Sequence, residues 1–148
     1  MTVKSKLEWS EKLSLNARTG SHSIPMDAGP PMSADSGPSP KELLLTSVLG
    51  CTAMDVLSLL RKYKQGVQGF SIAGEADTRA EHPKIFTDVR IDYEMTGEIA
   101  AEQAIEACRL SMTKYCGVSA MISKVVPIHY TITVNGVLVH RDQAEFDV

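Results

Sequence analysis

Residues 39–66 read SPKELLLTSVLGCTAMDVLSLLRKYKQG, and this stretch predicts one long helix. Ser39 is a favourable N-cap, Pro40 suits the first helical position, and Glu42 completes a capping box with Ser39. Basic residues in the last turn complement the helix dipole, and the helix is expected to end near Gly66. Its first two thirds are apolar on nearly all sides, so we expect it to be buried on most sides. One small domain has difficulty covering such a helix, which predicts a homodimer with this helix at its centre.

Alternating apolar and polar residues on both sides of this helix predict β-strands. We expect short antiparallel strands over 3–26, two longer strands over 67–79 and 85–96, and a last pair over 126–140 that turns at Asn135-Gly136. A second helix is expected over roughly 98–114 and a short one over 119–124. Residues 27–40 hold four prolines and two glycines and predict a long loop. This order of elements indicates an α+β fold.

Length and charge exclude several classes of protein. The chain has 148 residues, which predicts a single domain over 1–148. The net charge is −3 and the 15 Lys and Arg residues are scattered, so we expect no nucleic-acid partner. The longest uncharged stretch, residues 43–54, is shorter than the roughly 20 residues that span a bilayer, so we expect no membrane helix. The N-terminus lacks the apolar segment of a secretion signal, which favours a cytoplasmic location.

Three cysteines, Cys51, Cys108 and Cys116, are the residues that could carry chemistry. An odd number without a secretion signal argues against structural disulfides. Cys108 lies on the apolar stripe of its helix and is expected in the core. Cys116 precedes a short helix, whose positive end favours the thiolate. Burial as a small apolar side chain is the alternative for Cys51 and Cys116. The four histidines show no zinc-ligand spacing with the cysteines, so we expect no metal site.

Two cysteine segments resemble the signatures of the OsmC/Ohr family. The first is GPSPKELLL at 37–45 followed by GCTA at 50–53, and the second is YCGVS at 115–119. The segment EHPKIFT at 81–87 is similar to one common in OsmC-like members. Either cysteine segment alone would be a weak signal, whereas the two in this order are specific. The resemblance covers roughly residues 10–135 and implies an intertwined α+β homodimer with antiparallel sheets and a long buried central helix.

The resemblance also implies an activity, because the better-studied members are thiol peroxidases that reduce organic hydroperoxides. Carried over, the Cys51 thiolate attacks the peroxide and becomes a sulfenic acid, and Cys116 condenses with it to a disulfide. An external dithiol then resets the pair by exchange. This chemistry needs no cofactor and no metal.

A thiolate in an apolar interface needs a nearby cation to stay ionised. The family supplies an Arg from the N-terminal region, held by a Glu at the start of the central helix; the best match to the Arg here is Arg18, and Glu42 is the candidate for the Glu. The sequence departs from the family at Lys41, which stands at the family's Glu position, while Glu42 lies one residue later, about 100° round the helix. Gly117 also stands where Pro is common.

These departures leave several interpretations open. In the first interpretation, a local shift of the helix start brings Glu42 into the position of the family's Glu. In the second, Lys41 itself supplies the positive charge near the thiol. In the third, the peroxidase geometry is absent. The alternative for Arg18 is a solvated arginine at a strand end. If the peroxidase geometry is absent, the sequence favours a non-catalytic module that binds a small apolar ligand or a partner in the dimer groove.

Overall fold

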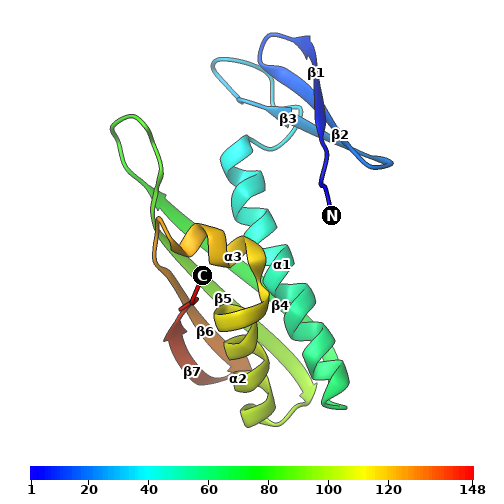
Figure 1. Cartoon of the computed structure of the whole chain (residues 1–148), viewed down its shortest axis with the longest axis vertical. Coiled ribbons are helices and arrows are strands. Elements are labelled where there is room, and N and C mark those ends of the chain that lie inside the picture. The colour runs from blue at the N-terminus through cyan, green and yellow to red at the C-terminus, as the bar shows by residue number, and fades with distance from the viewer. The chain divides into compact units, whose positions relative to one another are not determined.

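A computed structural model describes all residues from 1 to 148. The chain forms two compact units, Met1–Leu44 and Leu45–Val148, which are described separately (Figure 1). Strands and helices follow each other in the predicted order, with each predicted element found close to its expected place. The α+β class is thereby confirmed.

The N-terminal unit contains a three-stranded antiparallel sheet in the order β1-β2-β3. Its strands are β1 (Lys6–Glu11), β2 (Ser14–Thr19) and β3 (His22–Asp27). Each turn between them contains a residue with positive φ, Lys12 at 47° and Gly20 at 59°. Two-residue turns with positive φ match the twist of the flanking strands, which explains how such short strands pair directly.

A buried carboxylate closes this unit at the end of β3. Asp27 accepts hydrogen bonds from the hydroxyls of Ser14 at 2.8 Å and Ser36 at 2.7 Å, and from the backbone N–H groups of Gly29 and Ser36. The hydrogen bond from the Ser36 hydroxyl, helped by those from Ser14 and Gly29, holds the pKa of Asp27 well below its usual range. This carboxylate therefore ties the proline-rich loop to the sheet.

The long helix α1 (Pro40–Lys62) begins with the predicted capping box. The backbone N–H and the hydroxyl of Ser39 both donate to the Glu42 carboxylate at 2.7 Å, and the Glu42 N–H donates to the Ser39 hydroxyl at 3.4 Å. These reciprocal bonds satisfy donors that the first helical turn leaves unpaired. The start of the helix is thus set by Ser39 and Glu42 together.

Only one stripe of α1 is buried in the chain. Val48, Thr52, Val56 and Leu60 recur every four residues and face the core. Other apolar residues of α1 stay in solvent, with Met54 74% and Leu57 39% exposed. Only one side of α1 faces the sheet, so a single chain leaves much of this helix exposed, as expected for a helix that one small domain has difficulty covering.

By length and composition α1 is also able to span a membrane, since an 18-residue window in it has a mean hydropathy of 1.9. The uncharged stretch of twelve residues is shorter than the apolar part of this helix, because a single charged residue does not end an apolar helix. Length and composition alone therefore do not exclude a membrane helix. The packing of the Val48 stripe on the sheet identifies α1 as a core helix of the fold.

The C-terminal unit contains a four-stranded sheet in the order β4-β5-β6-β7 (Figure 1). Its strands are β4 (Gly66–Thr78), β5 (Phe86–Glu98), β6 (Ile128–Val134) and β7 (Val137–Gln143). Strands β5 and β6 are parallel, whereas the other pairs are antiparallel as predicted. The parallel pair arises because a helical connection, rather than a tight turn, carries the chain from β5 to β6.

That connection consists of α2 (Ala101–Leu110), a π-helical turn η1 (Ser111–Tyr115) and α3 (Gly117–Ser123). In the π turn the Cys116 N–H donates to the Ser111 carbonyl, five residues back, at 2.9 Å. The sequence predicts one regular helix to about residue 114. The structure instead ends the α-helical winding at Leu110 and inserts a wider turn, for which apolar spacing gives no signal.

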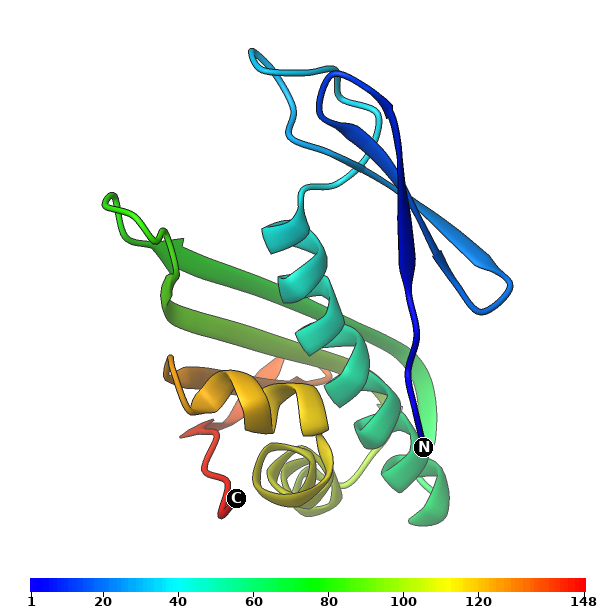
Figure 2. The same ribbon diagram turned by 45° about the horizontal axis from the view of Figure 1, so that its top comes forward.

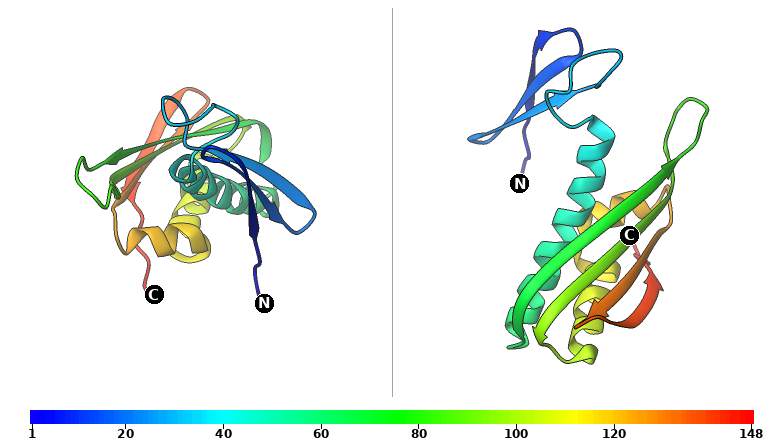
Figure 3. Two further views of the ribbon diagram at one scale, coloured as in Figure 1. Left: turned by 90° about the horizontal axis from the view of Figure 1, so that it is seen from above. Right: turned by 180° about the vertical axis from the view of Figure 1, so that it is seen from behind.

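The three helices lie on one face of the four-stranded sheet (Figure 2 and Figure 3). The inward-facing residues of β5 are Val89, Ile91, Tyr93 and Met95, which are all at most 1% exposed. Their alternation with polar residues is the pattern that predicted this strand. The core thus lies between the sheet and the helices.

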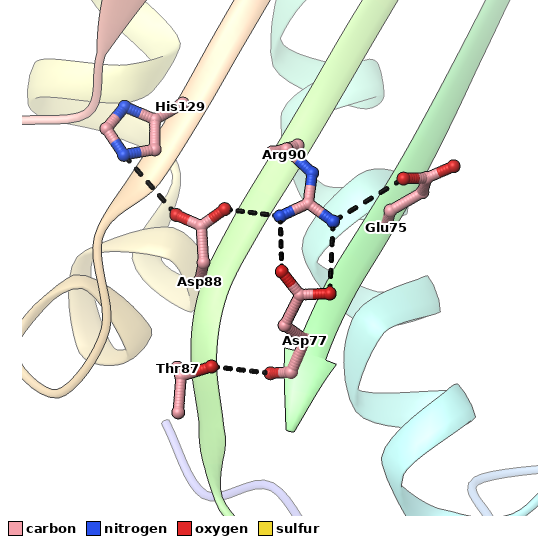
Figure 4. A network of polar contacts seen from close by, with 6 residues as sticks. All are labelled: Glu75, Asp77, Thr87, Asp88, Arg90 and His129. Atoms are coloured by element: carbon pink, nitrogen blue, oxygen red, sulfur yellow. Dashed lines mark hydrogen bonds and ion pairs between the residues drawn. The ribbon is translucent and has the colours of Figure 1, made fainter. Parts of the chain in front are cut away.

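The opposite face of the sheet carries an ion-pair network (Figure 4). The Arg90 guanidinium contacts the carboxylates of Asp77 and Asp88, and the His129 imidazole lies 3.3 Å from Asp88. Arg90 and Asp77 are well exposed to solvent, which screens such pairs and leaves them little effect on stability. We therefore assign this network to the solvated surface of the sheet.

Candidate functional site

Two cysteines and one aspartate meet within the C-terminal unit. The Sγ atoms of Cys51 and Cys116 and a carboxylate oxygen of Asp55 all lie within 4.8 Å of one another. Cys51 and Asp55 are one turn apart on α1, so their side chains leave the same side of the helix. Cys116 arrives from the N-cap of α3, 65 residues along the chain from Cys51. The fold therefore brings the two cysteines of the sequence motifs together as free thiols.

Cys116 is fully buried and is held by Ser119. Its thiol donates to the Ser119 hydroxyl at 3.0 Å and its sulfur accepts the Ser119 backbone N–H at 3.3 Å. Burial raises the pKa of the Cys116 thiol to about 11, against the opposing effect of the Ser119 bonds, and the neighbouring Cys51 raises it further. The bonds at the helix start thus lower the pKa of Cys116 in the predicted direction, but burial, which the sequence does not show, raises it by more.

The other two cysteines differ sharply in exposure. Cys51 is half-buried and is the member of the pair that solvent reaches. Cys108 is fully buried in α2 among core side chains, where burial raises the pKa of its thiol well above the usual range. The prediction that Cys108 is a core residue is confirmed. It takes no part in the cluster with Cys51.

A chain of hydroxyl groups lies behind the cluster. The Ser111 hydroxyl donates to the Asp55 carboxylate at 2.9 Å and lies 2.7 Å from the Thr52 hydroxyl, which lies 2.5 Å from that of Tyr93. Because an ionised carboxylate only accepts, the hydroxyls are ordered so that Tyr93 donates to Thr52, Thr52 to Ser111 and Ser111 to Asp55. Tyr93, Thr52 and Ser111 are all fully buried, so this chain fixes the orientation of Asp55 from the core.

Sequence reasoning missed these supporting residues. Asp55 had a usable signal, because a carboxylate four residues after a helical cysteine shares its side of the helix. The hydroxyls of Thr52 and Ser111 had none, because each is a single polar group within an apolar stretch of helix. Their pairing depends on how α1 packs against the turn that begins at Ser111.

The remaining predicted site residues belong to the N-terminal unit. Arg18 lies on β2, paired in register with Lys6 of β1 and Ser23 of β3. Glu42 binds Ser39 in the capping box, and the hydrogen bonds from the Ser39 backbone and hydroxyl lower the pKa of Glu42. Glu42 therefore has a demonstrated structural task. The roles that the family resemblance gives Arg18 and Glu42 beside the Cys51 thiol stay predictions.

This architecture, a four-stranded sheet backed by a long helix whose cysteine meets a second cysteine from the following helical segment, defines the class of OsmC/Ohr-fold proteins. A family model described as OsmC-like protein matches residues 33–131, and the chain belongs to that family. The resemblance seen in the two cysteine segments is thus confirmed.

Individual relatives agree with this assignment. Protein YhfA of Escherichia coli K12 is 34% identical over 134 residues, which cover 89% of this chain and 98% of YhfA. A hypothetical protein from Aquifex aeolicus is 28% identical with a TM-score of 0.80, over 91% of this chain and 98% of its own. An organic hydroperoxide resistance protein OsmC from Legionella pneumophila has a TM-score of 0.68 at 16% identity, over 90% and 98% of the two chains, and shares the fold.

Proposed function

We propose that this protein is a thiol peroxidase that reduces organic hydroperoxides, with Cys51 as the attacking and Cys116 as the resolving cysteine. The proposal is carried by the proximity of the two sulfurs, whose atoms lie within 4.8 Å although the residues are far apart in sequence. A disulfide requires a sulfur–sulfur distance of about 2.05 Å, so a modest movement of the two side chains suffices to form one. Family membership and the name of the Legionella relative support the choice of substrate.

The difference in exposure assigns the two roles. Cys51 is half-buried and accessible to a peroxide, whereas Cys116 is buried behind it. The Cys51 thiolate attacks the terminal oxygen of R–O–O–H, the O–O bond breaks, and the alkoxide takes a proton and leaves as an alcohol. The Cys116 thiol then condenses with the Cys51 sulfenic acid, which forms the disulfide and releases water. An external dithiol reduces this disulfide and becomes a disulfide itself.

The Cys51 thiolate requires positive charge nearby, and we propose Arg18 for that task. Glu42 is the proposed partner of Arg18, in keeping with the family pattern, and Lys41 is the alternative source of charge. The Asp55 carboxylate lies in the same cluster and repels the negative charge of a Cys51 thiolate, so the need for a nearby cation is stronger. Replacing Arg18 by Met should therefore slow peroxide reduction without affecting the folding of the C-terminal unit.

We further propose that the protein is a homodimer in a reducing compartment such as the cytoplasm. Met54 and Leu57 project from α1 into solvent, and a second subunit would cover this apolar surface. The three cysteines are free thiols, which suits a compartment that keeps them reduced. Light scattering of the full chain should give twice the mass of one subunit.

The decisive experiment follows consumption of an alkyl hydroperoxide with a dithiol reductant, in a buffer that contains a metal chelator. We expect Cys51→Ser to reduce the rate to that of the uncatalysed reaction, because no other thiol is accessible in the cluster. Cys116→Ser should leave the first oxidation intact and accumulate the Cys51 sulfenic acid, which dimedone traps for mass spectrometry. Cys108→Ser is the matched control and should match the unaltered protein. Peroxide consumption by Cys51→Ser at the full rate would contradict the proposal.

A further inference from the structure

The cluster of Cys51, Asp55 and Cys116 has a second property that does not depend on peroxide chemistry. We propose that these three side chains bind a thiophilic divalent cation of the zinc class. The sequence indicated no metal site because the histidines lack ligand spacing with the cysteines. The structure offers a different ligand set, in which a carboxylate one turn from Cys51 completes a pair of thiols.

The geometry suits a small tetrahedral ion. Zinc binds thiolate sulfur at about 2.3 Å and carboxylate oxygen at about 2.0–2.2 Å, so two sulfurs on one zinc lie roughly 3.8 Å apart. The three candidate ligand atoms already lie within 4.8 Å of one another. An ion at their centre therefore requires them to close by about 1 Å or less, within the reach of side-chain rotation.

The donor set selects the kind of ion. Sulfur ligands favour zinc and similar soft or borderline cations over calcium and magnesium, which prefer oxygen. Three potential anions at such short separation repel one another, and a divalent cation bound to all three removes that repulsion. Each thiol releases its proton to solvent when the metal–sulfur bond forms.

Neighbouring groups hold two of the three ligands in place. The Ser111 hydroxyl donates to Asp55, and the Thr52 and Tyr93 hydroxyls order Ser111 from the core. The Ser119 N–H donates to the Cys116 sulfur, and this bond strengthens when the sulfur becomes anionic. Such supporting hydrogen bonds orient metal ligands and tune their affinity. They also distinguish this cluster from a chance meeting of exposed side chains.

The site is reachable and incompletely surrounded by protein ligands. Cys51 and Asp55 are only partly buried, so an ion can enter from their side. Three protein ligands leave a fourth position for water or another small ligand, as in zinc sites that are not purely structural. A bound ion occupies both sulfurs, so the metal-bound form and the Cys51–Cys116 disulfide exclude each other. The metal would then protect the thiol pair from oxidation.

The test uses the reduced full-length protein, freed of metal and kept without oxygen. Cobalt(II) is the probe, because thiolate coordination gives a charge-transfer band in the near ultraviolet and tetrahedral geometry gives strong visible bands. We expect one equivalent of cobalt to bind with both signatures and one equivalent of zinc to displace it. Cys51→Ser and Cys116→Ser should each abolish this site. Asp55→Asn should weaken binding by more than the roughly 10–100-fold that loss of a ligand's supporting hydrogen bond costs, because it replaces a direct ligand.

Controls separate ligation from folding. Cys108→Ser, which alters a buried cysteine outside the cluster, should bind cobalt like the unaltered protein. Far-ultraviolet circular dichroism and thermal unfolding show whether each variant is folded, and Asp55→Glu offers a second variant that keeps the carboxylate. The proposal is overturned if the Cys51→Ser/Cys116→Ser double variant shows the same bands. It is equally overturned if Asp55→Asn binds cobalt as tightly as the unaltered protein.

Failure of this proposal is distinguishable from failure of the proposed peroxidase. Cobalt binding is measured without peroxide, and peroxide consumption is measured with chelator present, so each result stands on its own. Zinc at one equivalent should also block formation of the peroxide-driven Cys51–Cys116 disulfide, as followed by mass spectrometry. Disulfide formation at an unchanged rate with zinc in excess would overturn the joint occupation of both sulfurs.

Discussion

Asp27 in the N-terminal unit and Asp55 in the C-terminal unit both accept hydrogen bonds from hydroxyl groups, but they differ in how many donors they have and in which other groups lie beside them. Asp27 accepts hydrogen bonds on both carboxylate oxygens, from two serine hydroxyls and two backbone N–H groups. Asp55 accepts one hydroxyl, that of Ser111, and its remaining surroundings include the two thiols. The first carboxylate has its acceptor capacity filled from within the fold, whereas the second keeps capacity to spare beside reactive groups.

This difference separates a structural carboxylate from a functional one. A saturated carboxylate stabilises the loop that supplies its donors, and removing its charge weakens the fold. A carboxylate with free lone pairs next to sulfur contributes less to the fold and more to whatever binds there. The same substitution at the two positions should therefore affect different measurements.

The largest effect on folding is expected from Asp27→Asn, when it is compared with the same substitution at Asp55. At Asp27 both oxygens accept hydrogen bonds, so an amide N–H₂ must face a donor in either orientation, and the N-terminal unit should lose several degrees of thermal stability. At Asp55 the amide oxygen can keep the bond from Ser111, so folding should change little. Fluorescence of Trp9, the only tryptophan, reports on the N-terminal unit.

The pH dependence of the same pair of variants sharpens this prediction. The folded-state pKa of Asp27 is depressed, so its contribution to stability is present above the unfolded pKa of about 3.9 and is lost as the pH falls below it. Asp27→Asn lacks that contribution at every pH, so its deficit relative to the unaltered protein should shrink in acid. A deficit that stays constant down to acid pH, or equal losses for Asp27→Asn and Asp55→Asn, would contradict the comparison.

An intermediate effect is expected in the hydroxyl chain behind Asp55. Thr52→Val keeps the shape of the side chain but leaves the buried Tyr93 hydroxyl without a partner, which should cost about 1–3 kcal/mol in the free energy of unfolding. Denaturant titration measures this cost, with the exposed Thr46→Val on the same helix as control. The Thr52→Val/Tyr93→Phe double variant should recover part of the loss, because both partners are then apolar. If the stability losses of Thr52→Val and Tyr93→Phe add up in the double variant, the two hydroxyls do not act together.

The smallest effect is expected from Ser36→Ala in the N-terminal unit. This substitution removes one hydroxyl donor from Asp27 and leaves those from Ser14 and the backbone. The folded-state pKa of Asp27 should rise, because the Ser36 bond is the largest cause of its depression, so the unit should lose some stability at neutral pH, and this loss should shrink as the pH falls below about 3.9. Ser23→Ala, an exposed position on β3, is the control. Unchanged stability at neutral pH would show that Ser14 and the backbone suffice.

Much of the fold could be predicted because its local signals agree with its tertiary packing. Ser39 and Glu42 form the capping box that their spacing indicates, and Asn135 and Gly136 adopt positive φ values of 49° and 78° in the final turn. The alternation around Val89 and Tyr93 predicted β5 because one face of the sheet is wet. The parallel pairing of β5 with β6 could not be predicted, because it is set by the path of the helices between them.

The candidate site was predictable only in part, and for a physical reason. Cys51 and Cys116 were found through their resemblance to family motifs, and their residue types alone left core burial as an alternative. Asp55 and Ser111 were missed because one polar side chain on an apolar helix does not reveal its partner. The net direction of the Cys116 pKa could not be predicted, because burial, which depends on the whole fold, exceeds the effect of the local helix start.

The π turn from Ser111 to Tyr115 has a consequence for how this molecule can change. It holds one more residue than an α-helical turn, with the Asp55-bound hydroxyl at its beginning and Cys116 directly after its end. Deleting one residue inside it would restore ordinary winding and shorten the path from Ser111 to Cys116 by one residue, which moves Cys116 relative to the Asp55-bound hydroxyl. The number of residues in this turn, independent of their identity, therefore controls the direction in which the second sulfur points. Insertions and deletions there should be tolerated far less than substitutions at the exposed Lys114 and Tyr115.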